Sequence, residues 1–187
     1  MATDTNDLIE HLMVRNSSTS IHIPDVVVRD LFVNRDQRGT LTELLRSDWP
    51  GLFGGDLPFA QAYTSVTGGY IARDEDKWHV HKYQTDRFYC LAGQIVVAIA
   101  DQRAGSPSRG EILLVELSAS DDAPAPLVVT VPPGTLHGFL VTSTAPAMLA
   151  NFPNRLYDPA DEGRVRFADA KVMLGSTAPF SWDRIRR

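Results

Sequence analysis

Two short histidine motifs constrain the fold of this chain more than any other feature. The first is Trp78-His79-Val80-His81, followed by Asp86 and then by Gly93. The second is Pro132-Pro-Gly-Thr-Leu-His137, in which a Pro/Gly turn precedes the histidine. Residues i and i+2 of a strand point to the same face, so we expect His79 and His81 to project together. The two motifs therefore predict a β-structure whose interior receives all three histidines.

Short runs rich in β-branched and aromatic residues fill the chain from Ile21 onward, and turn residues separate nearly all of them. Examples are residues 95–100 and 112–117, which flank the turn Ser106-Pro-Ser-Arg-Gly110. This spacing is typical of a barrel or sandwich, and no segment with helical periodicity is long enough to cover a parallel sheet. The histidine motifs also resemble the paired signatures of cupins, with Asp86 where glutamate is usual. We therefore predict an all-β, cupin-type double-stranded antiparallel β-barrel, or jelly roll, with short peripheral helices.

The chain has 187 residues, enough for one domain with a sizeable core. Residues 1–20 combine a short amphipathic stretch around Leu8, Ile9 and Leu12 with a polar run. We predict that residues 1–20 form an N-terminal arm and that residues 21–187 form a single cupin domain.

Charge and composition exclude several classes of protein. The net charge of -5 argues against a nucleic-acid partner, which requires a basic face. The lone Cys90 excludes an internal disulfide framework and fits a reducing compartment. The polar, acidic start does not read as a signal peptide, and no apolar run is long enough to span a bilayer. We therefore expect a cytoplasmic protein with neither a nucleic-acid nor a membrane partner.

The histidine motifs allow two kinds of chemistry. His79, His81, Asp86 and His137 would together be a ligand set for a divalent transition metal with open positions. Alternatively, neutral imidazoles suit proton transfer, because their unperturbed pKa lies near neutral pH. Asp86 could also be an orienting partner for His81. The spacing of the residues does not separate these hypotheses.

Several further segments occur in a fixed order over roughly residues 26–167. They are Arg38-Gly-Thr-Leu-Thr-Glu43, Phe59-Ala-Gln61, His79, Ala100-Asp-Gln-Arg-Ala-Gly-Ser-Pro107, Val131-Pro-Pro-Gly-Thr-Leu-His-Gly-Phe-Leu-Val141 and Tyr157-Asp-Pro. In these segments the chain resembles the dTDP-4-dehydrorhamnose 3,5-epimerases. The resemblance implies a homodimeric cupin without a cofactor, acting on a small-molecule nucleotide sugar. In that family a histidine removes protons next to the 4-keto group of the sugar, and a tyrosine on the opposite face returns them.

The resemblance assigns roles to residues of this chain. His79 falls on the catalytic base and His137 on a histidine of the pocket. Lys77 could supply the phosphate-binding charge of an arginine that Asp76 replaces. Trp78 either stacks on a ring of the ligand or packs in the core. The residues at nucleotide-binding positions are Arg38, Glu43 and Gln61, for which a surface ion pair and a structural amide are the alternatives.

The opposite side of the pocket departs from the family. Asn151 occupies the position of the catalytic tyrosine, and an amide cannot donate a proton at neutral pH. Tyr63 is our candidate for the missing hydroxyl, because it shares a strand face with Gln61. Asp183 is our candidate for the acidic partner of the base.

A second resemblance is to the dTDP-sugar 3,4-ketoisomerases, which carry a similar His79-Val-His-Lys82 pattern followed by Gln84. In that group two histidines on one strand move protons between neighbouring carbons. We favour a nucleotide-sugar epimerase or isomerase of variant specificity, with His79, His81, Tyr63 and Asn151 as the catalytic positions. The alternatives are a 3,4-ketoisomerase, a metal-dependent cupin enzyme and a catalytically silent cupin that binds a nucleotide sugar.

Overall fold

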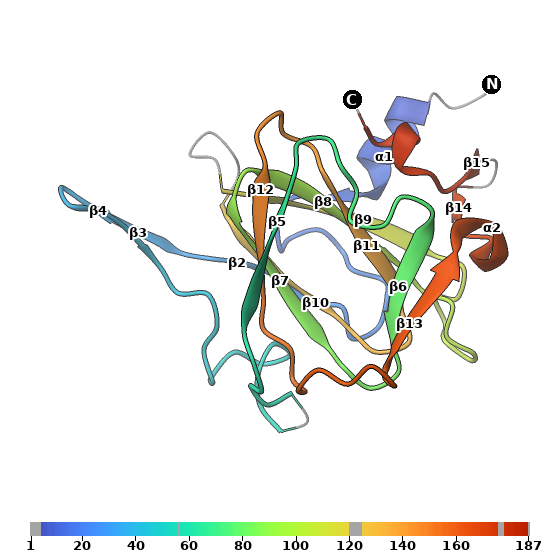
Figure 1. Cartoon of the computed structure of the whole chain (residues 1–187). Helices are drawn as coiled ribbons and strands as arrows, with labels where there is room; N and C mark the ends of the chain where they lie inside the picture. Colours follow the sequence, from blue (N-terminus) through green and yellow to red (C-terminus); the bar gives the residue numbers. More distant parts are fainter. Residues whose placement is uncertain (1–4, 56, 120–124, 176–177, 187) are drawn as a thin grey trace.

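The computed structural model describes residues 5–55, 57–119, 125–175 and 178–186, and most of its strands lie in two facing sheets (Figure 1). Among the described residues the first sheet has the order β1-β9-β8-β11-β6-β13 and the second the order β2-β10-β7-β12-β5. Neighbouring strands are antiparallel, except that β1 runs parallel to β9. The predicted cupin-type jelly roll with short helices is confirmed.

The strands have the following bounds. The first sheet contains β1 (Met13–Val14), β9 (Ile112–Ser118), β8 (Gln94–Ala100), β11 (Leu136–Val141), β6 (Lys77–His81) and β13 (Glu162–Arg166). The second contains β2 (Val28–Asp30), β10 (Leu127–Val131), β7 (Asp86–Ala92), β12 (Ala147–Asn151) and β5 (Tyr63–Thr67). Outside them lie the hairpins β3 (Val33–Asp36) with β4 (Gly39–Thr42) and β14 (Met173–Leu174) with β15 (Ala178–Pro179), and the helices α1 (Thr5–Leu12), α2 (Phe167–Ala170) and the 3₁₀ helix η1 (Trp182–Arg184).

Strand β8 shows why the central strands of the barrel have continuous apolar sequences. Ile95, Val97 and Ile99 belong to the core between the two sheets. Val96 and Ala98, on the other face, belong to a second core on the outside of the first sheet. Because both faces of the strand are buried, its sequence loses the alternation of a half-buried strand.

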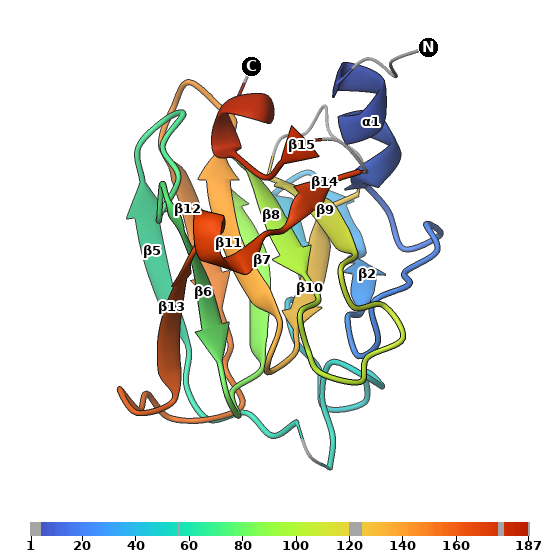
Figure 2. The same cartoon turned by 90° about the vertical axis from the view of Figure 1, so that its right-hand side faces the viewer.

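The outer face of the first sheet is covered by the two ends of the chain (Figure 2). Helix α1 contributes the buried Ile9, and the C-terminal segment contributes Phe180 and Trp182. The indole of Trp182 donates a hydrogen bond to the carbonyl oxygen of Asp74 at 2.9 Å. The predicted arm of residues 1–20 thus includes a helix that packs on the barrel. The division into an arm and a domain stays a prediction. Of these two ranges, residues 1–4, 56, 120–124, 176–177 and 187 lie outside the described residues. Within the described ranges, no helix has the length and apolar character needed to cross a membrane.

The β3–β4 hairpin extends away from both sheets (Figure 1). Its register places Asp36 opposite Gly39, whose φ of 133° is a conformation that L side chains rarely adopt. Arg38 lies in this turn and is therefore carried far from the body of the barrel. The hairpin also exposes the apolar side chain of Leu41.

The segment that follows β8 is held by the buried carboxylate of Asp101. Its oxygens accept hydrogen bonds from Arg103 Nε at 3.0 Å and Nη2 at 2.9 Å, and from the hydroxyls of Ser106 at 2.6 Å and Ser108 at 2.7 Å. Burial raises the pKa of this carboxyl, but the hydrogen bonds outweigh it and hold the pKa below its ordinary value. The Asp101–Pro107 motif thus has a structural role at the end of the barrel.

Replacing Asp101 by Asn should lower the free energy of unfolding by about 2–3 kcal/mol at neutral pH, because the charged hydrogen bonds are lost. The folded-state pKa lies below the unfolded one, so this stabilisation is present above the ordinary carboxyl pKa and is lost as the pH falls toward the folded value. Urea unfolding at neutral pH and near pH ~3 measures the difference. Asp183→Asn, at an exposed carboxylate, is the control. An equal difference between Asp101→Asn and wild type at both pH values would contradict this account.

Candidate active site

Three histidines from two neighbouring strands meet inside the barrel. The pairing of β6 with β11 places His79 directly opposite His137, and His81 lies two residues further along β6. His79 Nε2 is 3.1 Å from His81 Nε2, and ligand atoms of all three rings lie within 4.8 Å of one another. His79 is the most exposed of them, since 22% of its side chain is accessible, against 8% for His81 and 5% for His137.

Asp86 faces these histidines from the other sheet, at the start of β7. Its Oδ2 lies 3.6 Å from His81 Nε2 and 3.5 Å from His137 Nε2. Its Oδ1 accepts hydrogen bonds from Gln84 Nε2 at 2.7 Å and from Asn151 Nδ2 at 2.8 Å. Burial raises the pKa of Asp86, but the contact with His137 and the other polar neighbours outweigh it and lower the pKa. The carboxylate is therefore charged although it is almost completely buried.

Asn151 links this carboxylate to Tyr63. Its Nδ2 donates to Tyr63 Oη at 2.8 Å as well as to Asp86, and its Oδ1 accepts the backbone N–H of Arg87 at 2.9 Å. The side chain is fully buried and does not line the cavity described below. These bonds suit Asn151 to orient the hydroxyl of Tyr63, and its predicted place among the catalytic positions stays a prediction.

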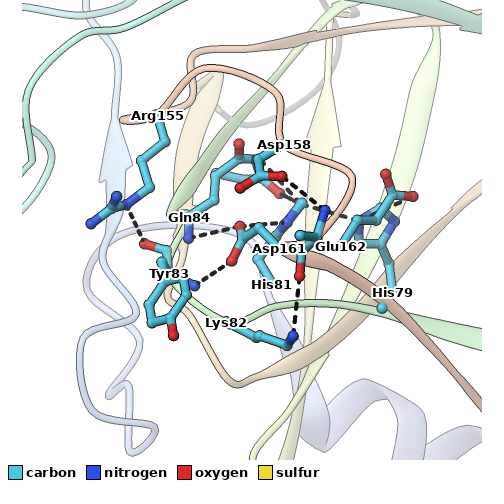
Figure 3. A network of polar contacts seen from close by, with 12 residues as sticks. His79, His81, Lys82, Tyr83, Gln84, Arg155, Asp158, Asp161 and Glu162 are labelled. Carbon is cyan, nitrogen blue, oxygen red and sulfur yellow. Dashed lines mark hydrogen bonds and ion pairs between the residues drawn. The ribbon is translucent and has the colours of Figure 1, made fainter.

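Two acidic residues next to the histidines, Asp161 and Glu162, were not predicted from the sequence. Strand β13 pairs with β6 and places Glu162 opposite His81. Glu162 Oε1 lies 3.9 Å from His79 Nε2, and Asp161 Oδ2 lies 3.2 Å from His81 Nδ1 (Figure 3). The alternation Glu162-Gly-Arg164 after the Tyr157-Asp-Pro turn was the available signal, since it puts both charged side chains on one face of a strand.

Asp183, our candidate for the acidic partner of the base, has no such role. It lies in η1, its side chain is 81% exposed, and it pairs with Arg186 at 2.8 Å. The acidic neighbours of the histidines come from β13 and the residue before it, because that strand is hydrogen-bonded along β6.

A cavity of about 390 Å³ opens in front of His79 and His81. One wall comes from β6 and β13 and carries these two rings with Glu162; the other comes from the second sheet and carries Tyr63. The wall residues combine aromatic, apolar and charged side chains: Gln61, Tyr63, Ser65, Arg73, His79, His81, Gln84, Phe88, Phe139, Leu149, Tyr157, Glu162 and Arg164. Such a mixture suits a polar organic ligand that also carries negative charge.

The electrostatics of the cavity favour uncharged imidazoles. Burial, with added repulsion from His137, Arg164 and His81, lowers the pKa of His79 to about 3. Burial also lowers the pKa of His81. For Tyr63, burial and the charge of Asp86 raise the pKa of the phenol. At neutral pH the cavity thus presents neutral ring nitrogens on one side and a protonated hydroxyl on the other.

Several residues predicted to bind substrate lie elsewhere. Trp78 is fully buried on the opposite face of β6, with its ring centroid 4.3 Å from that of Phe180. The predicted contact between Trp78 and a ligand is therefore corrected, because alternation along the strand turns its ring away from His79. Lys77 is exposed at the outer end of β6 and does not line the cavity.

The three predicted nucleotide-binding residues separate into two places. Gln61 lines the cavity, and its Nε2 donates to the carbonyl oxygen of Arg155 at 3.2 Å. Arg38 and Glu43 lie on or beside the projecting hairpin and make surface ion pairs, with Asp36 at 2.5 Å and Arg46 at 2.9 Å. Within one chain they do not line the cavity.

Replacing Asn151 by Leu should lower the free energy of unfolding by about 3 kcal/mol, because it removes a donor from the buried charge of Asp86 and leaves the Arg87 amide unsatisfied. Tyr63→Phe is the matched control and should cost less than about 1 kcal/mol, since the ring is 47% exposed. Urea unfolding of both variants measures the two losses. Similar losses for the two variants would contradict the anchoring role of Asn151.

Comparison with known proteins agrees with the fold. Residues 20–181 match the family model described as dTDP-4-dehydrorhamnose 3,5-epimerase. The probable low-salt glycan biosynthesis epimerase Agl13 of Haloferax volcanii is 37% identical over 146 residues, which is 78% of this chain and 87% of that protein.

Two solved structures extend the comparison. A dTDP sugar isomerase from Desulfovibrio desulfuricans has a TM-score of 0.73 at 24% identity and covers 88% of this chain and 95% of its own, which supports the fold. ChmJ, a 3'-monoepimerase of Streptomyces bikiniensis in complex with dTDP-quinovose, has a TM-score of 0.70 at 26% identity and covers 83% of this chain and 76% of its own. The chain therefore belongs to the dTDP-4-dehydrorhamnose 3,5-epimerase family, a family of carbohydrate epimerases.

Proposed function

We propose that this protein is a nucleotide-sugar epimerase that transfers protons next to the 4-keto group of a dTDP-linked or other NDP-linked 4-keto-6-deoxysugar. The observation that carries the proposal is the cavity with neutral His79 on one wall and the hydroxyl of Tyr63 on the other. The family supports the substrate class, and so does ChmJ, which was solved with a dTDP-sugar. In this chain Asn151 occupies the position of the family's catalytic tyrosine, and the hydroxyl comes from Tyr63 instead. This difference supports a specificity that differs from that of the 3,5-epimerases.

The reaction would use one proton acceptor and one proton donor. His79 takes the proton from the carbon beside the ketone, and the electron pair of the broken C–H bond moves to the ketone oxygen to form an enolate. Tyr63 then donates its phenolic proton to the same carbon from the opposite face. Asn151 Nδ2, 2.8 Å from Tyr63 Oη, donates a hydrogen bond that stabilises the phenolate left behind. The proton on His79 and the one that Tyr63 has lost equilibrate with solvent.

The charged wall of the cavity would hold the rest of the substrate. Arg73 and Arg164 line it, and an arginine is suited to bind a pyrophosphate through two parallel hydrogen bonds. Glu162 pairs with Arg164, so the arginine is partly neutralised until an anionic ligand enters. Gln61 would contribute an amide near the same opening.

The histidine pair favours a second candidate, a 3,4-ketoisomerase. His79 Nε2 and His81 Nε2 lie 3.1 Å apart on one wall, so one ring could remove a proton and the other could return one to the neighbouring carbon. This reaction would need no hydroxyl on the opposite wall. The contribution of Tyr63 therefore distinguishes the two candidates.

In deuterium oxide the enzyme should incorporate solvent deuterium beside the 4-keto group of a dTDP-4-keto-6-deoxysugar, detected by mass spectrometry and NMR. His79→Ala should slow the exchange at least about a thousandfold, since the proton acceptor is removed. The exposed His22→Ala is the control and should exchange at the wild-type rate. Full exchange by His79→Ala would rule out His79 as the base.

Tyr63→Phe separates the candidates in the same assay. An epimerase should still exchange its substrate but invert it about a hundredfold more slowly, because the donor on the opposite face is missing. A 3,4-ketoisomerase should form its product at nearly the wild-type rate with this variant.

We also propose a cytoplasmic homodimer in which the hairpin β3–β4 of one chain reaches the cavity of the other. Phe32 beside the hairpin is 78% exposed and Leu41 on it is 61% exposed, which supports burial against a second chain. This arrangement would bring Arg38 and Glu43 to a bound nucleotide. Lys77, at the outer end of β6, would add positive charge at the entrance.

The dimer proposal predicts that the protein sediments as a dimer and that Arg38→Ala weakens dTDP binding about tenfold, because one charged hydrogen bond to phosphate is lost. Analytical ultracentrifugation and titration calorimetry measure both. Arg109→Ala, outside the cavity and the hairpin, is the control and should bind as the wild type does. A monomer that binds dTDP equally well with and without Arg38 would refute the arrangement.

A further inference from the structure

Arg87 is a fully buried cation on the outer face of the second sheet. It follows Asp86 on β7, and alternation along the strand turns its side chain away from the histidines. Tyr89, on the same face, belongs to a third apolar core together with Trp49 and Val128. The guanidinium stays charged there, because arginine does not lose its proton in proteins. A cation in such surroundings is costly unless polar groups compensate its charge.

Backbone carbonyl oxygens provide this compensation. Arg87 Nη1 donates to the carbonyl oxygen of Phe152 at 2.6 Å, and Nη2 donates to those of Leu57 at 2.7 Å and Pro58 at 3.3 Å. These acceptors belong to two segments that are distant in the chain, one before β5 and one after β12. The planar group with its two arms therefore binds both segments at a fixed spacing.

The two segments lead directly to one wall of the cavity. Residues 57–58 precede β5, whose first residue is Tyr63, and residue 152 follows Asn151. Asn151 Nδ2 donates to the hydroxyl of Tyr63 at 2.8 Å, and its Oδ1 accepts the backbone N–H of Arg87 at 2.9 Å. Arg87 thus contacts both of the chain segments that place this hydroxyl in the cavity.

Strand β5 needs support at this end because it is an edge strand. Among the described strands of its sheet it has one neighbour, β12 (Figure 1). Tyr63 is paired with Asn151 at the last position of this ladder, and the ends of strands fray readily. Beyond that pair, the N–H of Ala60 donates to the carbonyl oxygen of Pro153 at 3.2 Å. The contacts of Arg87 lie beyond this bond and hold the two chain segments together where the ladder has ended.

We propose that Arg87 is a positioning residue for proton donation: it clamps residues 57–58 to residue 152 and so holds the hydroxyl of Tyr63 opposite His79. The inference rests on the proposed function, in which Tyr63 donates to the carbon that His79 has deprotonated. An apolar side chain would fill the same space without the cost of desolvating a charge, so packing alone does not account for an arginine here. Moving a reacting group by about 1 Å can slow a reaction about a hundredfold.

Arg87→Met tests the clamp through the ratio of inversion to exchange. In deuterium oxide the variant should exchange the proton beside the ketone within about twofold of the wild-type rate, since His79 is untouched. Inversion of the same carbon should slow at least about tenfold, because the donor on the other wall is displaced. NMR and mass spectrometry of the recovered sugar measure both rates. A general loss of stability would lower both rates together, so the ratio reports the position of the donor.

Arg103→Met is the matched control. Arg103 also joins two segments, since its Nη2 donates to the carbonyl oxygen of Pro24 at 3.0 Å and to Asp101 at 2.9 Å. It lies outside the set of described residues that line the cavity. Its replacement should lower stability and leave the ratio of inversion to exchange unchanged.

A double variant shows whether Arg87 acts through Tyr63. In the Tyr63→Phe background, Arg87→Met should slow inversion no further, because a positioning residue has no effect once the group that it positions is gone.

Hydrogen exchange of the free protein gives a readout that is independent of turnover. Arg87→Met should raise amide exchange in peptides covering residues 57–67 at least about tenfold and leave residues 95–100 of β8 unchanged. Arg87→Lys keeps the charge but loses the planar two-armed geometry, so it should cause a smaller rise and a smaller loss of the ratio. Arg87→Lys provides the test should Arg87→Met fail to fold, as judged by thermal unfolding.

Three outcomes would overturn the inference: an unchanged ratio in both Arg87 variants, unchanged amide exchange of residues 57–67, or an added loss of inversion in the double variant. Failure of the proposed function gives a different result, because the wild type would then invert none of the 4-keto sugars. That result would also remove the role of Arg87 in proton donation. A local rise in amide exchange would in that case leave Arg87 only as a clamp of the cavity wall.

Discussion

The carboxylate of Asp86 is buried between the two sheets, and the polar contacts of the site can be traced to the stabilisation of its charge. Gln84 and Asn151 donate to one of its oxygens, and His81 and His137 face the other. An unpaired carboxylate in such a position would cost several kcal/mol or would become protonated. These four residues, which we call the Asp86 cage, prevent both outcomes. The same contacts hold the rings and amides of the site in place.

The Asp86 cage connects the two walls of the cavity. Asn151 donates to both Asp86 and Tyr63. The hydroxyl on one wall is therefore linked, through Asn151, to the carboxylate that the histidines of the other wall face. A tyrosine at position 151 could not make these bonds, because it has one hydroxyl in place of an amide with two N–H groups. The departure from the epimerase pattern is therefore a coordinated change, in which the amide positions the group that would do the chemistry.

The rest of the barrel holds this polar end in register. The outer face of the first sheet is sealed by Trp78, Phe180 and Trp182, while its inner face contributes to the main core. Since the outer faces of β6 and β11 both pack in the second core, through Trp78 and through Leu136 and Leu140, the pairing of His79 with His137 cannot slip without moving apolar side chains out of that core. Rigid strands of this kind position functional groups more accurately than loops do.

The sequence by itself determined the fold class and the meeting of the three histidines. Motif spacing and strand periodicity are local properties, so the common face of His79 and His81 could be predicted without a partner strand. Trp78 shows the limit of the same rule, because alternation placed its ring on the other face and only the core that forms there determines its role.

Only the tertiary structure decided which acidic and amide groups surround the histidines. Glu162 reaches His79 through the pairing of β13 with β6, two segments distant in the chain. Asp183, our candidate for the acidic partner of the base, lies in the C-terminal helix η1 and pairs with Arg186. The role of Asn151 follows from its hydrogen bond to Asp86 on the neighbouring strand β7. The physical reason is that strand register and sheet packing, which no local pattern encodes, bring these distant side chains within hydrogen-bonding distance.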